Sequence, residues 1–401
     1  MSTKFLPKHR FLHCLYGIQV TRWSAPRAQM RHGPPIGNPQ PHVDIVHIPT
    51  SVSIVHIEVA ETIGKDTGMY AITFDGFGGP EVMRWSHVDD LPAPAPGEVA
   101  IEVIAAGVNR ADVMQRAGFY PPPTGASEIP GLEVSGFIAE VGPGVTQWRP
   151  GDAVCALLSG GGYAERVNVI ASQVLPVPAG VDVKAAAALP ETAATVWSNV
   201  VMTGGLRSGQ TLLVHGGGSG IGTHAIQVGR ALGAHVAVTA GSESKLQRCA
   251  DLGAQTLINY RTDDFAAVVN RECGGANVIL DIMGGSYLAS NIDALAENGH
   301  LTIIGLQGGA VAEVNLGTLL FKRASIHVTN LRRRPATGPG SKSEICAELT
   351  TKLWPLIDAG QVMPVVSAEI PVTDAGAAHE LLDSPQTVGK VLLLMPRGGA
   401  G

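Results

Sequence analysis

The sequence lacks several features that would assign it to a special class of protein. Its five cysteines are odd in number, widely scattered and far from any CxxC spacing (Cys14, Cys155, Cys249, Cys273 and Cys346). This pattern argues against a disulfide framework or a structural zinc lobe, and it suits a reducing compartment such as the cytoplasm. No apolar run is long enough to cross a bilayer, so no membrane partner is expected. The formal net charge of −6 gives no overall basic face, which disfavours nucleic acid as a partner.

The length and composition suit an α/β protein with two domains. The chain has 401 residues, of which 45% are hydrophobic and 15% charged, and it contains 50 glycines. A chain of this size is expected to form about two domains, each with its own hydrophobic core. Disordered and fibrous proteins have other compositions.

Residues 1–68 differ from the rest of the chain. The first 43 residues contain six Lys or Arg and no acidic residue, and residues 1–68 hold six of the 13 histidines. Acid-free, Arg-rich starts occur in organelle transit peptides. Because prolines interrupt the segment and it forms no clean amphipathic helix, we favour a disordered extension, or residues upstream of a true start at Met69. The histidines share no compact spacing and are not expected to bind metal.

The stretch Thr211–Gly222, TLLVHGGGSGIG, predicts a phosphate-binding turn. A buried strand is followed by glycines, and helical spacing begins at Ile221. In such a turn the backbone can approach a pyrophosphate, whose charge lies on N–H groups at the helix N-terminus. A glycine-rich turn alone is weak evidence, but here the required strand and helix flank it. The candidate phosphate-binding residues are Gly217, Gly218, Ser219, Gly220, Ile221 and Gly222.

Strands and helices alternate after this turn. Further strands are predicted at 235–240, 277–283 and 300–305, with helices around 243–252 and 286–297. Such alternation predicts a doubly wound parallel sheet, which makes residues 191–325 a Rossmann domain.

The flanking regions are rich in short strands. Residues 69–190 show strands separated by Pro/Gly turns, which predicts a partly open β-barrel that forms the substrate domain. The last strands, near 365–370 and 390–395, are expected to return to this barrel. Residues 326–401 would then complete the substrate domain, with the Rossmann domain inserted in it.

At this point the chain resembles the medium-chain dehydrogenase/reductase superfamily, and within it the zinc-free, zeta-crystallin-like quinone oxidoreductase branch. The likeness spans about 69–396 and implies a GroES-like fold for the barrel. It is carried by the segment from Asn109, NRADVMQRAGFYPPP, and by PGLEVSGFIAEVG, GDAVCALLSGGGYAE, AAALPETAATVW, VHGGGSGIG and VGKVLLLM. Ser219 and Tyr120-Pro121-Pro122-Pro123 most resemble the subgroup of tumour-suppressor-induced quinone oxidoreductases. Ser219 stands where the branch usually has glycine, and it can tighten the turn or donate to a phosphate.

The residues at the zinc positions of this superfamily predict no metal. Zinc-dependent relatives use an early Cys and a Gly-His-Glu triplet, whereas this chain has Asn109 and Gly131-Leu132-Glu133. Leucine cannot ligate zinc, and an amide is a poor substitute for a thiolate. Lewis-acid oxidation of alcohols is therefore not expected. Cys155 is interpreted as a small buried residue on a strand.

The end of the second Rossmann strand predicts NADPH rather than NADH. NAD sites place an acid there for the ribose 2′-OH, whereas this chain has Gly241-Ser242 followed by Lys245. A hydroxyl and a lysine suit a 2′-phosphate, although Glu243 would oppose this if it turned inward. Alternatively, Ser242 caps the following helix and Lys245 stays in solvent.

Other residues complete the predicted cofactor site. By analogy with the family, Tyr260 lies on the adenosine side. Four residues follow the fifth and sixth strands, at the edge where open sheets bind ligands, and their backbone groups are candidates for binding the carboxamide and ribose: Gly305, Leu306, Asn330 and Leu331.

The resemblance places Asn109 and Tyr120 beside the nicotinamide. Asn109 can orient a carbonyl, and Tyr120, held rigid by three prolines, can stack on substrate or donate a proton. Alternatively, Tyr120 is a lid that packs without touching substrate. The expected activity is NADPH-dependent reduction of quinones by hydride transfer. The alternatives are an enoyl or alkenal reductase that acts on enones, and a non-catalytic NADPH-binding sensor or RNA-binding protein.

Three further features have simple interpretations. The resemblance suggests a homodimer that extends the Rossmann sheets. The run Arg332-Arg333-Arg334 is interpreted as a solvated loop, or as a second contact for cofactor phosphate, rather than a nucleic-acid patch. His215 is expected to be a packed, hydrogen-bonded histidine rather than a catalytic base.

Overall fold

The structure is a computed structural model that describes residues 68–396. All of these residues belong to one of the two units into which the contacts divide the chain. The predictions for residues 1–68 and for Cys14 lie outside the described residues, apart from Gly68.

Within this part of the chain, one sheet consists of six parallel strands in the order β10-β9-β8-β11-β12-β13. The strands are β8 (Thr211–His215), β9 (His235–Ala240), β10 (Thr256–Asn259), β11 (Ala276–Asp281), β12 (Leu295–Ile303) and β13 (Ser325–Val328). The chain enters the sheet at β8, builds outward to β10, and returns to build β11 to β13 on the other side. This is the order of a doubly wound Rossmann fold, in which ligands bind where the strand order reverses, here between β8 and β11.

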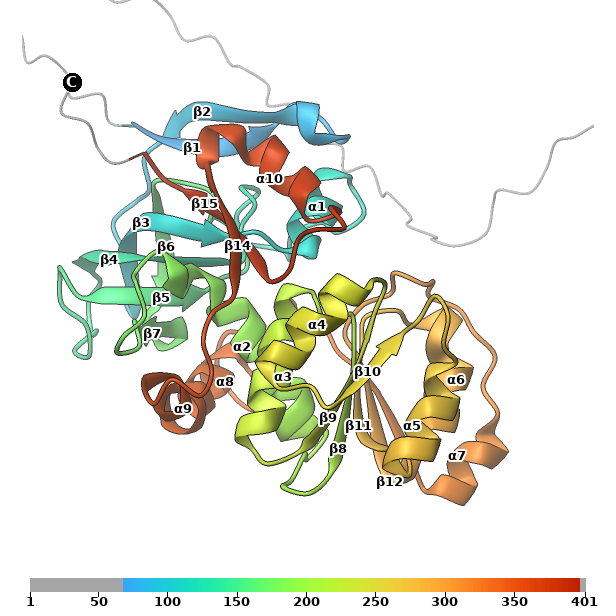
Figure 1. The fold of residues 1–401 in the computed structure, drawn as a ribbon. Coiled ribbons are helices and arrows are strands. Elements are labelled where there is room, and N and C mark those ends of the chain that lie inside the picture. Colours follow the sequence, from blue (N-terminus) through green and yellow to red (C-terminus); the bar gives the residue numbers. More distant parts are fainter. Residues whose placement is uncertain (1–67, 397–401) are drawn as a thin grey trace, which may run out of the picture. The chain divides into compact units, whose positions relative to one another are not determined.

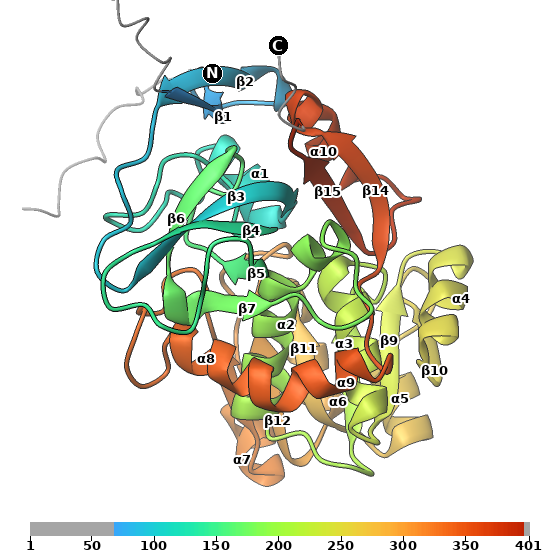
Figure 2. The ribbon, with the colours of Figure 1, turned by 90° about the vertical axis from the view of Figure 1, so that its left-hand side faces the viewer.

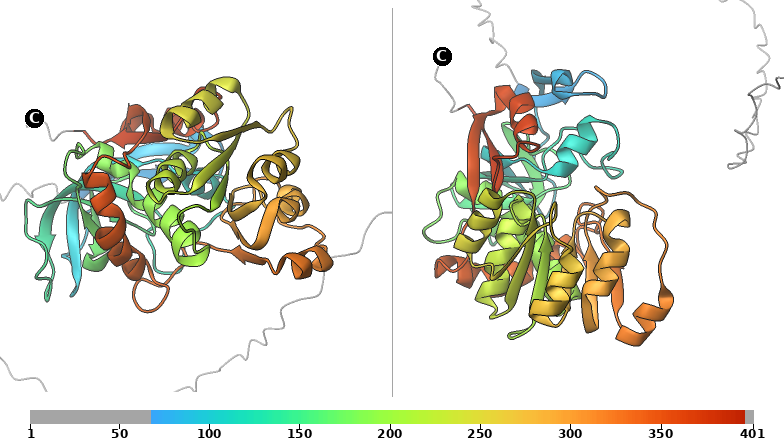
Figure 3. Two further views of the ribbon diagram at one scale, coloured as in Figure 1. Left: turned by 60° about the horizontal axis from the view of Figure 1, so that its bottom comes forward. Right: turned by 45° about the vertical axis from the view of Figure 1, so that its right-hand side comes forward.

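Alternate residues of β8 face opposite sides of this sheet, as successive side chains of a strand do. Leu212 and Val214 belong to one buried cluster and Leu213 to another. Because helices cover both faces, the three central residues Leu212–Val214 are all apolar rather than alternating (Figures 1 and 3). The helices of this domain are α3 (Gly220–Ala231), α4 (Glu243–Leu252), α5 (Phe265–Cys273), α6 (Leu288–Ala294) and α7 (Leu316–Lys322).

A second large sheet combines strands from both ends of the described chain, in the order β14-β15-β3-β4-β5-β7, with β6 paired to β3. Its strands are β3 (Glu98–Gly107), β4 (Glu133–Val141), β5 (Ala153–Leu157), β6 (Arg166–Ile170), β7 (Val174–Pro176), β14 (Val366–Pro371) and β15 (Lys390–Leu394). The remaining elements of this domain are β1 (Gly68–Phe74), β2 (Met83–Asp89), α1 (Arg110–Arg116) and α10 (Ala375–Leu381). Because β15 pairs with β3, the six-stranded domain is inserted within this one (Figure 2).

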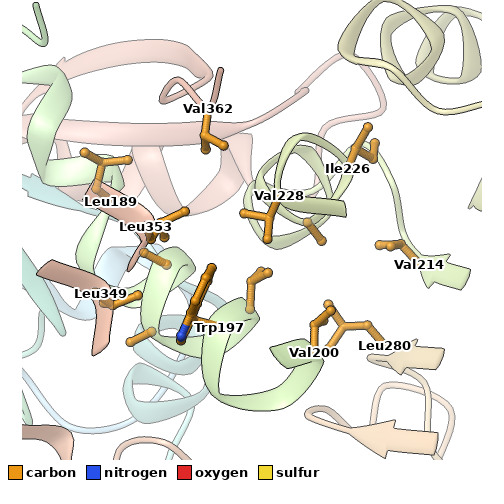
Figure 4. Close-up of a cluster of buried hydrophobic side chains, with 14 of the residues drawn as sticks. Leu189, Trp197, Val200, Val214, Ile226, Val228, Leu280, Leu349, Leu353 and Val362 are labelled. Carbon is orange, nitrogen blue, oxygen red and sulfur yellow. The ribbon is translucent and has the colours of Figure 1, made fainter. Parts of the chain in front are cut away.

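A shared hydrophobic cluster joins the two sheets. Helix α2 (Pro190–Val196) continues into a π-helical turn at Trp197–Thr203 and contributes the Trp197 side chain to the cluster (Figure 4). Helices α8 (Lys342–Glu348) and α9 (Trp354–Asp358) pack there too, together with Leu157 of β5. These contacts remove apolar surface of both domains from water at once, which disfavours their separation.

Residues 326–396, the described part of the segment 326–401, do not all complete the substrate domain. Strand β13 pairs with β12 in the six-stranded sheet, and α8 and α9 pack in the shared cluster. Strands β14 and β15, the short 3-10 turn Val372–Asp374 and helix α10 join the substrate domain. The helix predicted at 286–297 is also shorter, because Leu295 begins β12 and pairs with Ala276. In the described residues no helix has the length and hydropathy needed to cross a membrane.

Candidate active site

The phosphate turn lies at the carboxyl end of β8, where the strand order reverses. Gly216 has a φ of +71°, and Ser219 caps α3 by accepting the N–H of Gly222 at 3.0 Å. A Cβ on Gly222 would lie 2.3 Å from the Gly216 carbonyl oxygen, so glycine is required. Ser219, Gly220 and Ile221 line a cavity, into which α3 presents its positive N-terminal end. Ser219 therefore tightens the turn, which is one of the two roles considered for it.

The side chains beyond β9 place one cation at this turn and a second beside Gly241. The stem of Lys245 packs over Gly218, where a Cβ would lie 3.1 Å from Lys245 Cδ. A Cβ on Gly241 would lie 2.4 Å from the Tyr260 hydroxyl and 3.3 Å from Arg261 Nε, so both side chains extend over this glycine. The sequence analysis missed Arg261, although its position next to Tyr260 was a usable signal.

Ser242 is a helix cap in this structure. Its Oγ accepts the N–H of Lys245 at 3.4 Å at the start of α4. Glu243 is exposed, so it does not turn inward against a phosphate. Partial burial lowers the pKa of Lys245.

A cavity of about 510 Å³ extends from the phosphate turn to residues of the substrate domain. The predicted cofactor residues that line it are Gly218, Ser219, Gly220, Ile221, Gly241, Lys245, Tyr260 and Gly305. Gly217 is buried beneath the turn. Leu306, Asn330 and Leu331 do not line the cavity: Leu306 is 52% exposed, and Leu331 packs in the shared cluster. Their predicted backbone contacts to the cofactor have no support in this geometry.

Asn109 precedes α1 and lines the same cavity. Its carbonyl oxygen accepts from Lys390 Nζ at 2.7 Å, and its amide donates to Glu133 Oε1 at 3.0 Å and to the Gly107 carbonyl at 3.3 Å. Since an ammonium only donates and a carboxylate only accepts, the amide has a single satisfactory orientation. Both of its N–H groups are used, so Asn109 offers the cavity an acceptor and cannot orient a carbonyl by donation.

Lys390 and Glu133 form a buried ion pair with an Nζ–Oε1 distance of 2.6 Å, and their side chains are 6% and 0% exposed. Lys390 also donates to the Val108 carbonyl at 2.8 Å, and Glu133 Oε2 accepts the N–H of Glu191 at 2.9 Å. Each charge is therefore paired and hydrogen-bonded, as its burial requires. The Lys390 stem packs on Gly220, where a Cβ would lie 2.5 Å from Lys390 Cδ. The pair thus links the phosphate turn to Asn109.

The same pair bears on the metal prediction. Glu133 ends the triplet that contains Leu132 in place of a histidine, and the Lys390 ammonium supplies the positive charge beside its carboxylate. In the described part of the chain, no three His, Cys, Asp or Glu side chains gather closely enough to hold a metal ion. This set of side chains does not suit zinc, and the lack of a metal in the protein stays a prediction.

Asp112 fixes the start of α1 through hydrogen bonds to its carboxylate. Its carboxylate accepts the N–H of Asn109 at 2.8 Å, the N–H of Gly131 at 3.1 Å and the hydroxyl of Tyr163 at 3.2 Å. Burial raises the pKa of Asp112 to about 6, against the opposing effect of the two backbone donors. The acid of the NRAD segment thus positions the backbone around Asn109.

Tyr120 does not line the cavity. Its hydroxyl donates to Asn330 Oδ1 at 2.8 Å, and burial raises its pKa. The guanidinium carbon of Arg332 lies 5.5 Å from the centre of its ring. This geometry matches the interpretation of Tyr120 as a packed lid, with its hydroxyl proton donated to Asn330.

Arg332 corrects the interpretation of the arginine run as a solvated loop. Its side chain is 3% exposed and donates to Gln115 Oε1 at 2.7 Å and to the Ser159 carbonyl at 2.8 Å. Only Arg333 is exposed as expected, with Arg334 half-buried. Arg332 is instead the residue that holds the loop after β13 against the Tyr120 segment.

Glu191 is a second residue that the sequence analysis missed. It lies in the first turn of α2 and lines the cavity. Its Oε2 is buried and has no hydrogen-bond partner among the described residues. Burial, aided by the nearby Glu133 carboxylate, raises the pKa of Glu191 to about 8. The signal was its position as the only charge in the apolar segment AAALPETAATVW.

His215 is packed and hydrogen-bonded, as predicted. Nδ1 lies 3.0 Å from Thr239 Oγ1, Nε2 lies 2.7 Å from Asn291 Oδ1, and the ring contacts Phe265 and Tyr287 edge-on. Burial lowers the pKa of His215. Both nitrogens are engaged below the phosphate turn, so neither is available as a base.

Comparisons with known proteins agree with this architecture. Residues 95–179 match the alcohol dehydrogenase GroES-like domain, and residues 220–341 match the zinc-binding dehydrogenase family. Quinone oxidoreductase 1 of Escherichia coli K12 is 34% identical over 329 residues, which make up 80% of this chain and 98% of that protein. A 2-haloacrylate reductase of a Burkholderia species is 32% identical over 327 residues, or 79% of this chain and 96% of that protein.

A solved structure is similar over the same region. The crystal structure of Escherichia coli quinone oxidoreductase in complex with NADPH has a TM-score of 0.71 and 32% identity, and the match covers 81% of this chain and 99% of that chain. Together these matches confirm the predicted fold class, a GroES-like domain combined with a Rossmann domain.

Proposed function

Because this chain belongs to the quinone oxidoreductase branch of the medium-chain dehydrogenase/reductase superfamily, we propose that it reduces quinones with NADPH. The observation that carries the proposal is the cavity itself. One wall is a phosphate turn of dinucleotide-binding type, and the other wall contains Asn109 and Glu191 from the substrate domain and α2. A dinucleotide and a small electron acceptor can therefore meet between the two domains.

The residues around the turn fit the cofactor. Gly218, Ser219 and Gly220 would hold the pyrophosphate, since a Cβ at these glycines or at Gly222 would fill space that is already occupied. Lys245 and Arg261 would pair with the 2′-phosphate, because no acid at the end of β9 competes for the ribose. When bound, NADPH supplies a hydride.

At the other end of the cavity, the side chains mainly position the bound ligand. Asn109 is locked by Lys390 and Glu133, so its carbonyl oxygen can accept an N–H of a bound ligand at a fixed place. Tyr120 holds its own segment against the loop after β13 through its contacts with Asn330 and Arg332, and it does not itself react. A quinone is already a good acceptor, and it gains most from orientation in a site without water.

A specific observation also favours an enone or enoyl reductase as second candidate. Such a reaction requires a proton donor besides the hydride, and Glu191 places a carboxyl group in the cavity wall. The similarity to a 2-haloacrylate reductase supports the same candidate. An RNA-binding role gains no support from the arginine run, because Arg332 is buried.

Steady-state oxidation of NADPH and NADH by the full-length chain tests these functions. An ortho-quinone, a para-quinone and an α,β-unsaturated ketone are supplied in turn. Turnover of quinones with a preference for NADPH supports the proposal, and turnover of the enone alone supports the second candidate. NADPH binding without turnover of any acceptor would leave only a sensor.

We also propose a homodimer in the cytoplasm. Strand β13 forms one edge of the six-stranded sheet, and Val328 on it is 69% exposed. The neighbouring α7 exposes Leu316, Leu320 and Phe321 by 73%, 76% and 81%. An apolar edge of this kind suits sheet extension by a second copy. The cysteines of the described residues are all free, which suits a reducing compartment.

A further inference from the structure

The start of α2 fixes Glu191 in the cavity wall. Pro190 precedes it at the first helical position, and the N–H of Glu191 donates to Glu133 Oε2 at 2.9 Å. The backbone is therefore held both by the proline ring and by a charged acceptor. Thr195, one helical turn further along, lines the same cavity. Glu191 thus belongs to the face of α2 that borders the cavity.

The carboxyl group of Glu191 has no partner in the described protein. Its Oε2 is buried without a hydrogen bond. Lys390, the cation with the largest favourable effect on the Glu191 charge, already donates to Glu133, Asn109 and the carbonyl of Val108. Glu191 as a whole is half-buried, and removing even one unpartnered carboxylate oxygen from water disfavours the charged form, so a carboxyl in this position favours its protonated state.

The charges that face Glu191 come from several packed elements. Glu133 of β4 and Asp112 of α1 oppose a further negative charge, whereas Lys390 of β15 and Lys342 of α8 favour it. Lys342 is occupied too, because its Nζ donates to Ser159 Oγ at 2.6 Å. Burial is the largest influence, and the resulting pKa of about 8 leaves the acid mostly protonated at neutral pH.

The other groups that interact electrostatically with Glu191 cannot replace it as a donor. Tyr120 directs its hydroxyl to Asn330, and Arg332 is held by Gln115 and by the carbonyl of Ser159. The amide of Asn109 has used both N–H groups. Glu191 is the one carboxyl group among the residues that line the cavity.

We propose that Glu191 is the acid that protonates the reduced substrate. This inference rests on the proposed function, since hydride addition leaves negative charge on the carbonyl oxygen of the quinone or enone. The O–H bond of Glu191 breaks, its proton forms the O–H bond of the hydroquinone or enol, and Glu191 becomes a carboxylate. Water reprotonates the carboxylate when the product leaves, so protons and electrons balance. A donor placed where charge develops accelerates such steps by about 10²–10⁴-fold.

The experiment compares the wild type with Glu191→Gln, which keeps the shape of the side chain but cannot release a proton. Glu191→Asp retains the acid, and Glu140→Gln on the exposed part of β4 is the matched control. For each protein, kcat and KM are measured with an enone and a quinone from about pH 6 to pH 10. NADPH affinity is measured separately by fluorescence. Infrared difference spectra of the cofactor-free protein over the same range record the protonated carboxyl group directly.

The expected wild-type kcat falls above about pH 8, where Glu191 loses its proton. Glu191→Gln should lower kcat for the enone by about 10²-fold or more, with a smaller loss for the quinone, and abolish this pH limb. Its NADPH affinity should change less than twofold, and the infrared band lost near pH 8 should be missing. Glu191→Asp should restore part of the rate.

Two results would overturn the role of Glu191 while the proposed function stands. In the first, wild type turns over substrate but Glu191→Gln retains its rate and its pH profile. In the second, the infrared band persists in Glu191→Gln, which assigns the titrating carboxyl to another residue. A wild type that reduces neither acceptor refutes the proposed function, and the donor role with it.

Discussion

Replacing Lys390 with Met is the sharpest structural perturbation, because it removes one charge and keeps the stem that packs on Gly220. The Glu133 carboxylate would then be buried without its ammonium, and losing one partner of a buried pair costs about 3–5 kcal/mol. Glu133 keeps the N–H groups of Asn109 and Glu191, which places the expected cost near the lower limit. At roughly 2–4 °C per kcal/mol, about 3 kcal/mol corresponds to a fall in Tm of about 6–12 °C.

Thermal unfolding followed by circular dichroism, at one scan rate and without cofactor, measures this loss. The double variant Glu133→Gln with Lys390→Met removes both charges and should recover a large part of the lost stability. Lys184→Met is the matched control, since the Lys184–Glu369 pair has a distance of 3.9 Å and side chains 33% and 43% exposed. An exposed pair of this kind contributes about 0–1 kcal/mol.

The reasoning fails if Lys390→Met loses no more stability than Lys184→Met. It also fails if the double variant loses the sum of the two single effects, because Lys390 and Glu133 would then act independently. Either result would mean that the pair is not the contact that holds Asn109 in place, and the orientation assigned to its amide would lose its basis.

Three further predictions address the cofactor, the lid and the dependence of stability on pH. Changing Lys245 and Arg261 together to Ala should raise KM for NADPH by about 10–100-fold, because charge-assisted bonds to the 2′-phosphate are lost. The kinetics with NADH should stay nearly unchanged. Equal effects on both cofactors would exclude a 2′-phosphate site. Tyr120→Phe removes one hydrogen bond and keeps the contact with Arg332, so kcat should fall less than tenfold and its pH profile should not change. A large loss of kcat together with a new limb in the pH profile would make Tyr120 the proton donor. The folded-state pKa of Glu191 is raised, so its proton stabilises the fold fully below about pH 4.5, and this stabilisation is lost as pH rises to about 8. Thermal unfolding should therefore show that Glu191→Gln gains stability relative to the wild type across this pH window, by at most about 1.4 kcal/mol per pH unit. A stability difference that stays constant with pH would contradict the raised pKa.

The fold was largely predictable because its signals are local. The apolar run of β8, the glycines after it and the helical spacing from Ile221 are contiguous in the sequence. The other strands of a parallel sheet are likewise indicated by short apolar runs. The end of α6 was harder to place. Leu295 suits a helix as well as a strand, and its pairing with Ala276 of β11 decides between them. Strand pairing of this kind depends on tertiary contacts that no short window contains.

The reacting end of the site resisted prediction because its partners are far apart in sequence. The NRAD segment marks Asn109 as important, but the residue that orients its amide, Lys390, lies 281 positions away. A lysine at the start of a strand is normally solvated, and only the approach of Glu133 and Gly220 makes this one a buried, fully paired cation. The same reasoning applies to Tyr120, whose hydroxyl is bound to Asn330, 210 positions away. Sequence motifs identify which side chains reach the site. The assignment of donor and acceptor roles requires the partners of each polar group, and here the bond of Tyr120 to Asn330 and the unpartnered Oε2 of Glu191 are the observations behind proposing Glu191 as the proton donor.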